Sequence, residues 1–456
     1  MSTSRTIPFP SRLPVGEARL KTNSLIVMVV VALLIGTAAR ISLLIIYPIV
    51  VFVIAAVYRF RFSAALLLLL IVITVGLILS FFNGWFIGYK LLALYYILPF
   101  LLLLFATLPA GTKADNFNIY FKCIAAVAGL NDIVGFGQFL KFPDSDDSFQ
   151  GLFSQYSTSI NGLMLLNAVV FFYYFMKLMQ VKSTQNLLFT IFFLTSSVLG
   201  FYGAGQIICI LAFILAFYRF KITAIIKTGL IATGGILAIF FLLLLFKPYA
   251  LEYNMVNLQR LVSFDVEHGP RKIRSFYNYG VSYPRDPKDF LFGSGPGTFN
   301  SRSAFMVGSP SYFPSFVWKE DQKPYYFLNY AYPLWNEKNT SQALYLDGFR
   351  NQPFSTLLAF LGEYGLIFTL LFGYLFYRMY RETARAYLMV KENRNAVIEF
   401  RVFKFLFLLL IFLLLIDNYL EFPETMVTVV LGLKFAQQAL LHRVLNLNDN
   451  TSVFDE

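Results

Sequence analysis

The dominant feature of this sequence is a series of apolar runs separated by short basic segments. The runs are about 20 residues long, which is the length that an α-helix needs to cross a hydrocarbon core about 30 Å thick. The chain is 58% hydrophobic and only 14% charged, a balance far more apolar than that of a soluble domain. The sequence therefore predicts an all-α polytopic membrane protein.

The pattern predicts about twelve transmembrane helices. They are expected at residues 24–38, 41–58, 62–82, 91–110, 118–140, 159–176, 187–200, 204–218, 228–246, 354–376, 405–420 and 425–441. Between the ninth and the tenth lies a large polar and aromatic insert, so the chain divides into residues 1–246, 247–353 and 354–456. No cleavable signal peptide is expected, because the first apolar run is long enough to remain as a span.

Lysine and arginine are distributed unevenly between the two sides of this arrangement. With the N-terminus in the cytoplasm, the inner connections hold most of the basic residues, whereas the short outer connections hold only Arg40, Lys90 and Lys141. Such a bias sets membrane orientation. Both termini are therefore predicted to be cytoplasmic and the insert to be periplasmic. The same topology accounts for the net charge of +12, so no nucleic-acid partner is expected.

The basic segment 378–404 follows the tenth predicted span. Its charge pattern predicts a short cytoplasmic helix that lies in the membrane interface and fixes the topology. Binding of a partner protein by this segment is the alternative.

The insert is dense in Tyr, Phe, Pro and Gly, and we expect short helices and loops that fold onto the helix bundle rather than a free-standing domain. Its run GSGPGTFN places Gly293, Gly295 and Gly297 at alternate positions. No βαβ unit surrounds this run and its glycine spacing is wrong, which excludes a dinucleotide fingerprint. The run predicts a tight turn where the backbone approaches another group closely, with a plain surface turn as the alternative.

A basic cluster lies just upstream of the glycine run. Arg271, Lys272 and Arg274 fall within four residues, and Arg260 and His268 flank them. Guanidinium groups offer a fork of donors that matches phosphate oxygens, so the cluster indicates a pyrophosphate site at the outer membrane face. A solvated basic patch, or contact with lipid headgroups, is the alternative.

Acidic residues inside predicted spans are costly to insert and are therefore candidates for function. Asp132 is the only acid deep in any of the first nine predicted spans; its alternative role is a polar lock between helices. Glu363 lies in the tenth. It is predicted either to face a cavity beneath the insert or to pair with a buried Arg or Lys.

Two acidic groups lie on predicted outer connections, one at Asp417, Glu421 and Glu424 and the other at Asp144, Asp146 and Asp147. Converging oxygen ligands would suit a divalent cation, but solvated loops explain both groups, and no metal and no cofactor is predicted. The only cysteines, Cys123 and Cys209, both lie in predicted spans, which excludes a structural disulfide in the insert and argues against a cysteine-based metal site. His442 is expected at the cytoplasmic interface, and His268 is either a base or phosphate contact or an ordinary surface histidine.

Together these features resemble the O-antigen ligase and polysaccharide polymerase (Wzy-type) superfamily of bacterial inner-membrane glycosyltransferases. The matching features are the twelve spans with both ends inside, the insert between the ninth and the tenth, and three local motifs. The motifs are the Arg-bearing segment with Arg271 and Arg274, the turn LFGSGPGTF, and the segment GEYGLIFTLLF that opens the next span.

The resemblance implies transfer of a glycan from undecaprenyl pyrophosphate to an acceptor sugar hydroxyl at the periplasmic face of the inner membrane, without a metal. Its partners would be the lipid-linked glycan, the acceptor glycan and the bilayer, with room for a chain-length regulator. The residues it assigns to the substrate are Arg260, Arg271, Arg274, Arg302 and Arg350 with the three glycines, and the candidate bases are Glu267, His268 and Glu363. Trp318, Tyr325, Tyr326 and Trp335 offer flat faces for sugar rings, or serve as interfacial anchors.

Departures from the family pattern favour a polymerase over a ligase. Ligases of this group carry a His shortly before the GLI element, whereas this chain has FRNQPFSTLLAFLGEYG there. The Ser-Arg at the outer end of an earlier span is also missing from SSVLGFYGAGQ. We therefore expect a polymerase of lipid-linked repeat units, with an O-antigen ligase acting on a lipid A-core acceptor as the alternative. A transporter or flippase of lipid-linked sugar is the rival from another class, and a structural scaffold for envelope assembly is a weaker one.

Overall fold

The computed structural model describes residues 63–83, 88–105, 115–142, 148–152, 158–200, 202–217, 271–283, 286–304, 324–335 and 353–451, with isolated positions between 234 and 263. The predicted spans 24–38 and 41–58 lie outside the described residues, as does most of the span predicted at 228–246.

Every regular element in the described residues is helical, and no strand occurs among them. The α-helices are α3 (Ala64–Ser80), α4 (Gly88–Phe105), α5 (Asp115–Lys141), α6 (Thr158–Gln180), α7 (Thr184–Leu199), α8 (Gly203–Phe217), α11 (Arg271–Val281), α12 (Pro287–Phe292), α15 (Thr356–Ala359), α16 (Gly365–Met389), α17 (Arg394–Ile416) and α18 (Pro423–Thr451). Short 3-10 or π turns are η1 (Phe81–Asn83), η2 (Phe327–Ala331), η3 (Tyr332–Leu334), η4 (Phe360–Tyr364) and η5 (Tyr419–Glu421).

Four of the described helical segments are long and apolar enough to cross a membrane: Gly88–Phe105, Asn116–Lys141, Gly162–Gln180 and Thr356–Met389. The described residues are thus all-α and include helices able to cross a membrane, as the apolar runs predicted. The count of twelve and the orientation remain predictions.

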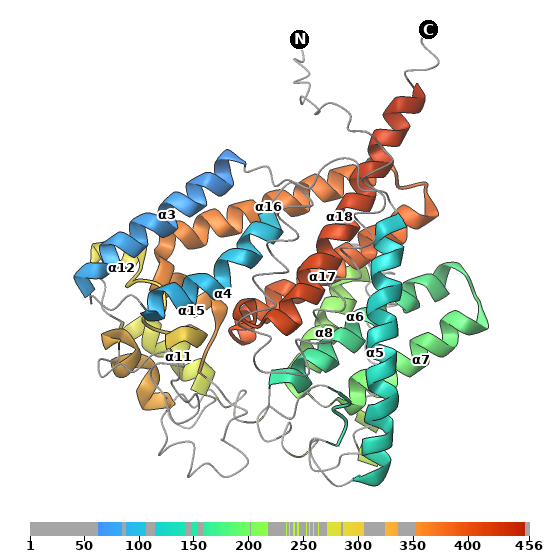
Figure 1. Ribbon diagram of the computed structural model, residues 1–456, viewed down its shortest axis with the longest axis horizontal. Coiled ribbons are helices and arrows are strands. Elements are labelled where there is room, and N and C mark those ends of the chain that lie inside the picture. The colour runs from blue at the N-terminus through green and yellow to red at the C-terminus, as the bar shows by residue number, and fades with distance from the viewer. Residues whose placement is uncertain are drawn as a thin grey trace.

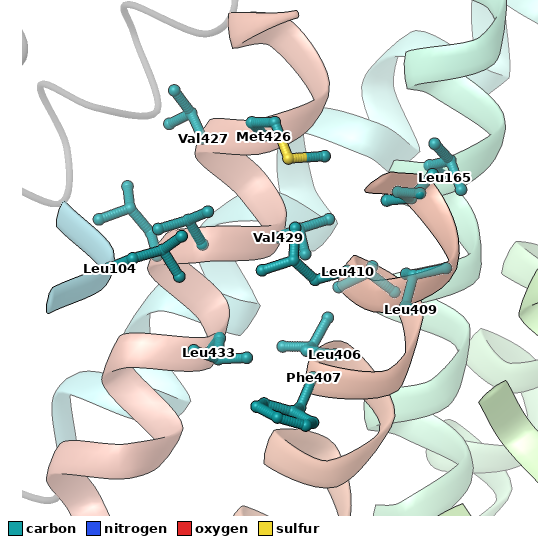
Figure 2. Close-up of a cluster of buried hydrophobic side chains, with 14 of the residues drawn as sticks. Leu104, Leu165, Leu406, Phe407, Leu409, Leu410, Met426, Val427, Val429 and Leu433 are labelled. Carbon is teal, nitrogen blue, oxygen red and sulfur yellow. The ribbon is translucent and has the colours of Figure 1, made fainter. Parts of the chain in front are cut away.

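The core of the bundle lies around α17 and α18, which cross the middle of the molecule (Figure 1). Leu406 and Leu410 on α17 meet Val429 and Leu433 on α18, and these side chains are essentially inaccessible (Figure 2). On another face of α17, the ring of Phe405 stacks on Phe172 of α6 with centroids 4.1 Å apart. Close packing of this kind holds helices together where lipid is as apolar as the side chains themselves.

The prediction of a separate interfacial helix at 378–404 is wrong. Helix α16 continues without a break to Met389, a short turn follows, and α17 begins at Arg394, where Asn393 caps it. Both helices continue beyond their apolar runs, because polar residues there form hydrogen bonds with residues of neighbouring helices. Buried Glu399 on α17, for example, accepts hydrogen bonds of 2.7 and 2.6 Å from Arg443 of α18.

The tenth predicted span is broken near its start. After one turn of α15 the chain forms the π turn η4, and α16 then begins at Gly365 with φ at +81°. The end of α12 packs against this break. The approach is so close that a Cβ on Gly365 would lie 2.4 Å from the carbonyl oxygen of Leu291. Irregular backbone of this kind is tolerated at membrane depth only where protein or a water-filled cavity covers it.

Candidate functional site

The glycine run of the insert forms a loop, Gly293–Ala304, that is buried along its whole length. We call these residues the glycine loop. It lies where the end of α3, the start of α4 and the break of the tenth span meet, with α12 leading into it on the left of Figure 1. The sequence predicted a turn that approaches another group closely, and the loop meets three such groups, one at each glycine.

The three glycines have φ values of +84°, +113° and +76°. A Cβ on Gly293 would lie 2.2 Å from the carbonyl oxygen of Glu363, and one on Gly297 would lie 2.4 Å from that of Tyr89. Left-handed backbone disfavours any other residue, and both positions also lack the room for one. The glycines therefore seat the loop against η4 and α4.

Replacing Gly297 with alanine is expected to destabilise the protein by about 2–5 kcal/mol, because about 1–2 kcal/mol of left-handed strain adds to overpacking of about 1–3 kcal/mol. Thermal unfolding of the detergent-solubilised protein measures the change. Gly373→Ala is the matched control, since it lies within α16 and a Cβ there meets nothing within 4 Å. Equal unfolding midpoints for the two variants would contradict the close approach.

Glu363 is the centre of the loop's hydrogen bonding. Its side chain is completely buried in η4. Oε1 accepts backbone N–H bonds from Phe299, Asn300 and Ser301 at 2.9, 2.8 and 2.8 Å, and Oε2 accepts one from Gly297 at 2.6 Å.

The four backbone donors occupy both oxygens of this carboxyl group, which leaves it poorly placed to accept a proton from a substrate. The geometry therefore argues against Glu363 as the catalytic base. We assign it a positioning role instead: it holds the glycine loop in one conformation.

Asn300 and Asn418 join the loop to the remaining segments around it. The side chain of Asn300 accepts a bond of 2.7 Å from the Ser355 N–H and donates one of 3.3 Å to Ser275 of α11. The side chain of Asn418 donates a bond of 2.8 Å to the carbonyl oxygen of Asn300. Through these contacts, α11, the start of α15 and the 417–422 connection all pack against the glycine loop at Asn300.

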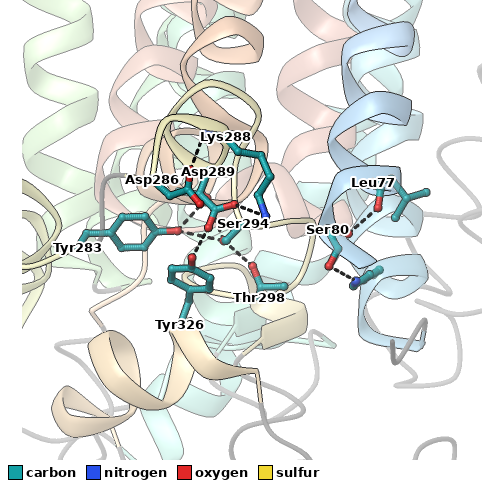
Figure 3. A network of polar contacts seen from close by, with 11 residues as sticks. Leu77, Ser80, Tyr283, Asp286, Lys288, Asp289, Ser294, Thr298 and Tyr326 are labelled. Carbon is teal, nitrogen blue, oxygen red and sulfur yellow. Dashed lines mark hydrogen bonds and ion pairs between the residues drawn. The ribbon is translucent and has the colours of Figure 1, made fainter. Parts of the chain in front are cut away.

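A second network anchors the near end of the loop (Figure 3). The Tyr283 hydroxyl donates toward Ser294 Oγ and the carbonyl oxygen of Gly362, each at 3.0 Å. Beside it, the hydroxyl of Tyr326 donates to buried Asp289, which also lies 3.4 Å from the ammonium of Lys288. Burial is the main cause that raises the pKa of both tyrosines, so their hydroxyls act as hydrogen-bond donors in this network.

Arg302, at the far end of the loop, is buried with a fractional exposure of 7%. Its backbone N–H donates to Glu421 Oε2 at 2.6 Å, and its Nη1 donates to the carbonyl oxygen of Glu421 at 3.2 Å. The guanidinium carbon lies 4.3 Å from the ring centroid of Phe422 and 5.4 Å from that of Tyr96. Arg302 therefore presents a cation between aromatic rings, an arrangement that holds it out of water.

Helix α11 supplies the other predicted cations. Arg271 is also 7% exposed, and its guanidinium carbon lies 5.7 Å from the ring centroid of Trp335. Arg274 is partly buried one turn further on. Burial lowers the pKa of the neighbouring Lys272, and the carboxyl of Asp417 opposes that shift.

None of these three residues is classed as exposed: Arg271 is buried, and Lys272 and Arg274 are partly buried. The aromatic residues divide differently. Tyr326 and Trp335 are buried, whereas Tyr325 is 60% exposed.

Lys90 is a further cation that the sequence placed in an outer connection. It lies in the first turn of α4 and is completely buried. Its ammonium donates to the carbonyl oxygen of Ser80 at 2.9 Å and lies 4.4 Å from the ring centroid of Phe81. Because Ser80 and Tyr89 contact Gly295 and Gly297, Lys90 lies beside the glycine loop. In the sequence, only the position of Lys90 directly before an apolar run indicated that this residue could be buried.

Glu421 is the acid that the sequence assigned to an outer turn but that the structure places in this site. Its side chain is completely buried in η5, and Oε1 has no hydrogen-bond partner among the described residues. Burial raises the pKa of Glu421 well above its ordinary value, the charge of Glu363 raises it further, and Arg302 opposes the rise. A carboxyl with a raised pKa and one unoccupied oxygen is suited to proton transfer.

The raised pKa of Glu421 predicts a pH-dependent stability. The folded protein holds the proton more tightly than the unfolded chain, so this stabilisation is complete below the ordinary pKa of 4.5 and is lost as the pH rises through the higher folded value. We expect the unfolding midpoint of the wild type to fall relative to that of Glu421→Gln as the pH is raised above 4.5. Parallel midpoint curves for the two proteins would contradict a proton on Glu421.

Several predicted site residues lie outside the described residues: Glu267, His268, Arg260, Arg350 and Trp318. Their roles remain predictions. Among the described residues, no group of three or more His, Cys, Asp or Glu side chains is arranged to hold a metal ion. Asp132 lies in α5, on the other side of the molecule from α11 and α12 (Figure 1).

The described site therefore combines a rigid glycine loop, the buried cations Arg271, Arg302 and Lys90, and one carboxyl suited to proton transfer. Chemically, such a site can stabilise a multiply charged anion and take up a proton next to it. Comparison of the chain with protein-family models and with curated proteins found no match.

Proposed function

We propose that this chain is a membrane glycosyltransferase that polymerises lipid-linked polysaccharide repeat units. In this reaction a glycan leaves undecaprenyl pyrophosphate and joins an acceptor sugar hydroxyl at the periplasmic face of the bacterial inner membrane. The single observation that carries the proposal is a glycine loop that Glu363 holds rigid, with buried Arg302 within it and buried Arg271 on helix α11, which contacts the loop through Ser275.

The proposed reaction exchanges one bond at the anomeric carbon for another. The bond between the anomeric carbon and the pyrophosphate oxygen breaks, and a new bond forms from that carbon to the acceptor oxygen. Negative charge grows on the leaving pyrophosphate, and preorganised cations in a site without water stabilise such charge strongly. Arg271 and Arg302 take this role, with Lys90 beside the loop as support.

The acceptor hydroxyl must also lose its proton. Glu421 is the described residue best suited to receive it, because its Oε1 is unoccupied and Arg302 lies directly against it. Glu267 and His268 remain candidates from the sequence. Before each turnover Glu421 must be ionised, so the reaction is expected to slow as the pH falls.

The proposal is tested by incubating the purified, reconstituted protein with a lipid-linked repeat unit. Products longer than one repeat, formed together with free undecaprenyl pyrophosphate, support polymerisation. Transfer only to an added lipid A-core acceptor would favour the ligase alternative instead. If neither product forms although the protein is folded, the proposal fails.

The break in the tenth span favours one alternative function, which is transport of lipid-linked sugar. Transporters commonly build their substrate sites from discontinuous helices, and η4 with Gly365 makes such a break. A flippase would move lipid-linked sugar across proteoliposome membranes without forming a bond. Flux in the absence of longer products would therefore select the transport function over the polymerase.

A further inference from the structure

A second buried polar site lies among α5, α6 and α7, well separated from α11 and α12 (Figure 1). It consists of Asp132 on α5, Asn167 on α6 and Ser196 on α7, and all three side chains have no measurable exposure. Helices α5 and α6 both belong to the segments that can cross a membrane. An acid at such a position is a candidate for function.

The hydrogen bonding of this trio is incomplete. Asn167 Nδ2 donates to Asp132 Oδ1 at 3.0 Å. Three further buried atoms, Asp132 Oδ2, Asn167 Oδ1 and Ser196 Oγ, have no hydrogen-bond partner among the described residues. The groups that face the Asp132 carboxyl are the neutral side chains of Asn167, Ser196 and Asn131, and no salt bridge reaches it from the described residues of α5, α6 or α7.

An ionised carboxylate in these surroundings would be a buried charge that no cation of the described residues opposes, which is strongly unfavourable. A proton on Oδ2 changes the balance, because it removes the charge and turns Oδ2 into a donor. Asn167 Oδ1 and Ser196 Oγ, which are also buried without a partner among the described residues, can then accept a hydrogen bond from Oδ2. One proton thus neutralises the acid and supplies the missing donor.

We propose that Asp132 is an intramembrane proton-binding site, with the proton held on Oδ2 and shared with the oxygens of Asn167 and Ser196. A metal cation fits less well, because hard cations such as Ca²⁺ take six or more oxygen ligands and the N–H of Asn167 already occupies one carboxylate oxygen. The site lies outside the glycosyl-transfer site proposed above, which uses no residue of α5, α6 or α7. It makes the packing of these three helices depend on a bound proton.

Infrared difference spectroscopy tests this proposal on the purified full-length protein. The difference between wild type and Asp132→Asn at about pH 7 is expected to contain one carboxylic-acid C=O band. The band should shift in heavy water, and Ser197→Ala should retain it, since the Ser197 hydroxyl already donates to the Met164 carbonyl at 3.3 Å. A difference spectrum with only carboxylate bands would overturn the proposal.

Two further arms keep the test decisive. Asn has the shape of neutral Asp, so Asp132→Asn is expected to fold with a wild-type midpoint. If it does not fold, Asn167→Ala assigns the band, because removing a hydrogen-bond partner shifts its frequency, and an unchanged spectrum would count against a proton there. Replacement of the C=O band by carboxylate bands when sodium chloride replaces N-methylglucamine chloride, at constant pH, would show a sodium site and overturn proton binding.

Discussion

Replacing Glu363 with alanine is expected to destabilise the protein by about 4 kcal/mol or more, one of the largest effects of any single substitution in the described residues. The carboxylate accepts four backbone N–H groups of the glycine loop, and each is left buried without an acceptor when the side chain is removed. An unsatisfied buried donor costs about 1–3 kcal/mol, and partial relaxation of the loop offsets some of the sum. Thermal unfolding in detergent measures the loss.

A graded comparison separates this effect from a change of charge. Glu363→Gln keeps the Oε1 acceptor for three donors and loses only the bond to Gly297, so its loss should be clearly smaller. Glu382→Ala is the matched control on α16, because that carboxylate is exposed and pairs with Arg378 in a surface i,i+4 contact. Surface pairs of this kind contribute about 0.2–1 kcal/mol. A midpoint for Glu363→Ala equal to that of Glu382→Ala would show that the loop does not depend on this carboxylate.

Loss of either buried guanidinium is expected to lower the polymerisation rate by about 10²–10³-fold, the effect typical of removing one preorganised group that stabilises developing negative charge. Arg302→Ala and Arg271→Ala are the two tests. In a strain without the chromosomal copy, both variants should leave glycans of a single repeat, which is also the expected result of deleting the gene. Gel analysis of the polysaccharide gives the chain-length distribution.

Two controls decide whether charge or shape matters. Arg302→Lys keeps the positive charge but loses the fork of donors, so it should recover only part of the activity. Arg381→Ala removes an exposed guanidinium of α16 and should leave long chains intact. Because Arg302 also donates to the 417–422 connection, the unfolding midpoint of each variant must be measured alongside. Long chains made by folded Arg302→Ala and Arg271→Ala variants would refute the role assigned to both residues.

The local sequence was sufficient to predict apolar helices that can cross a membrane and the position of the glycine loop. Runs of apolar residues define helices by their length alone, and α3 to α8 follow the predicted spans closely. The glycine run predicted a close backbone approach, and Arg271 and Arg302 were selected because guanidinium groups suit pyrophosphate. Where charged residues found partners across helices, as Glu399 does with Arg443, the ends of the predicted spans were wrong.

The helical character of the chain and its apolar spans could thus be predicted from the amino-acid sequence, because hydrophobic length is a property of each segment separately. The folded arrangement was needed to show that Glu363 accepts hydrogen bonds from backbone N–H groups, that Lys90 lies inside the protein, and that Glu421 lies against Arg302. These relations join residues from distant segments, so they depend on which surfaces pack together. No local pattern encodes the four donors that meet one carboxylate, since backbone N–H groups look alike in every sequence.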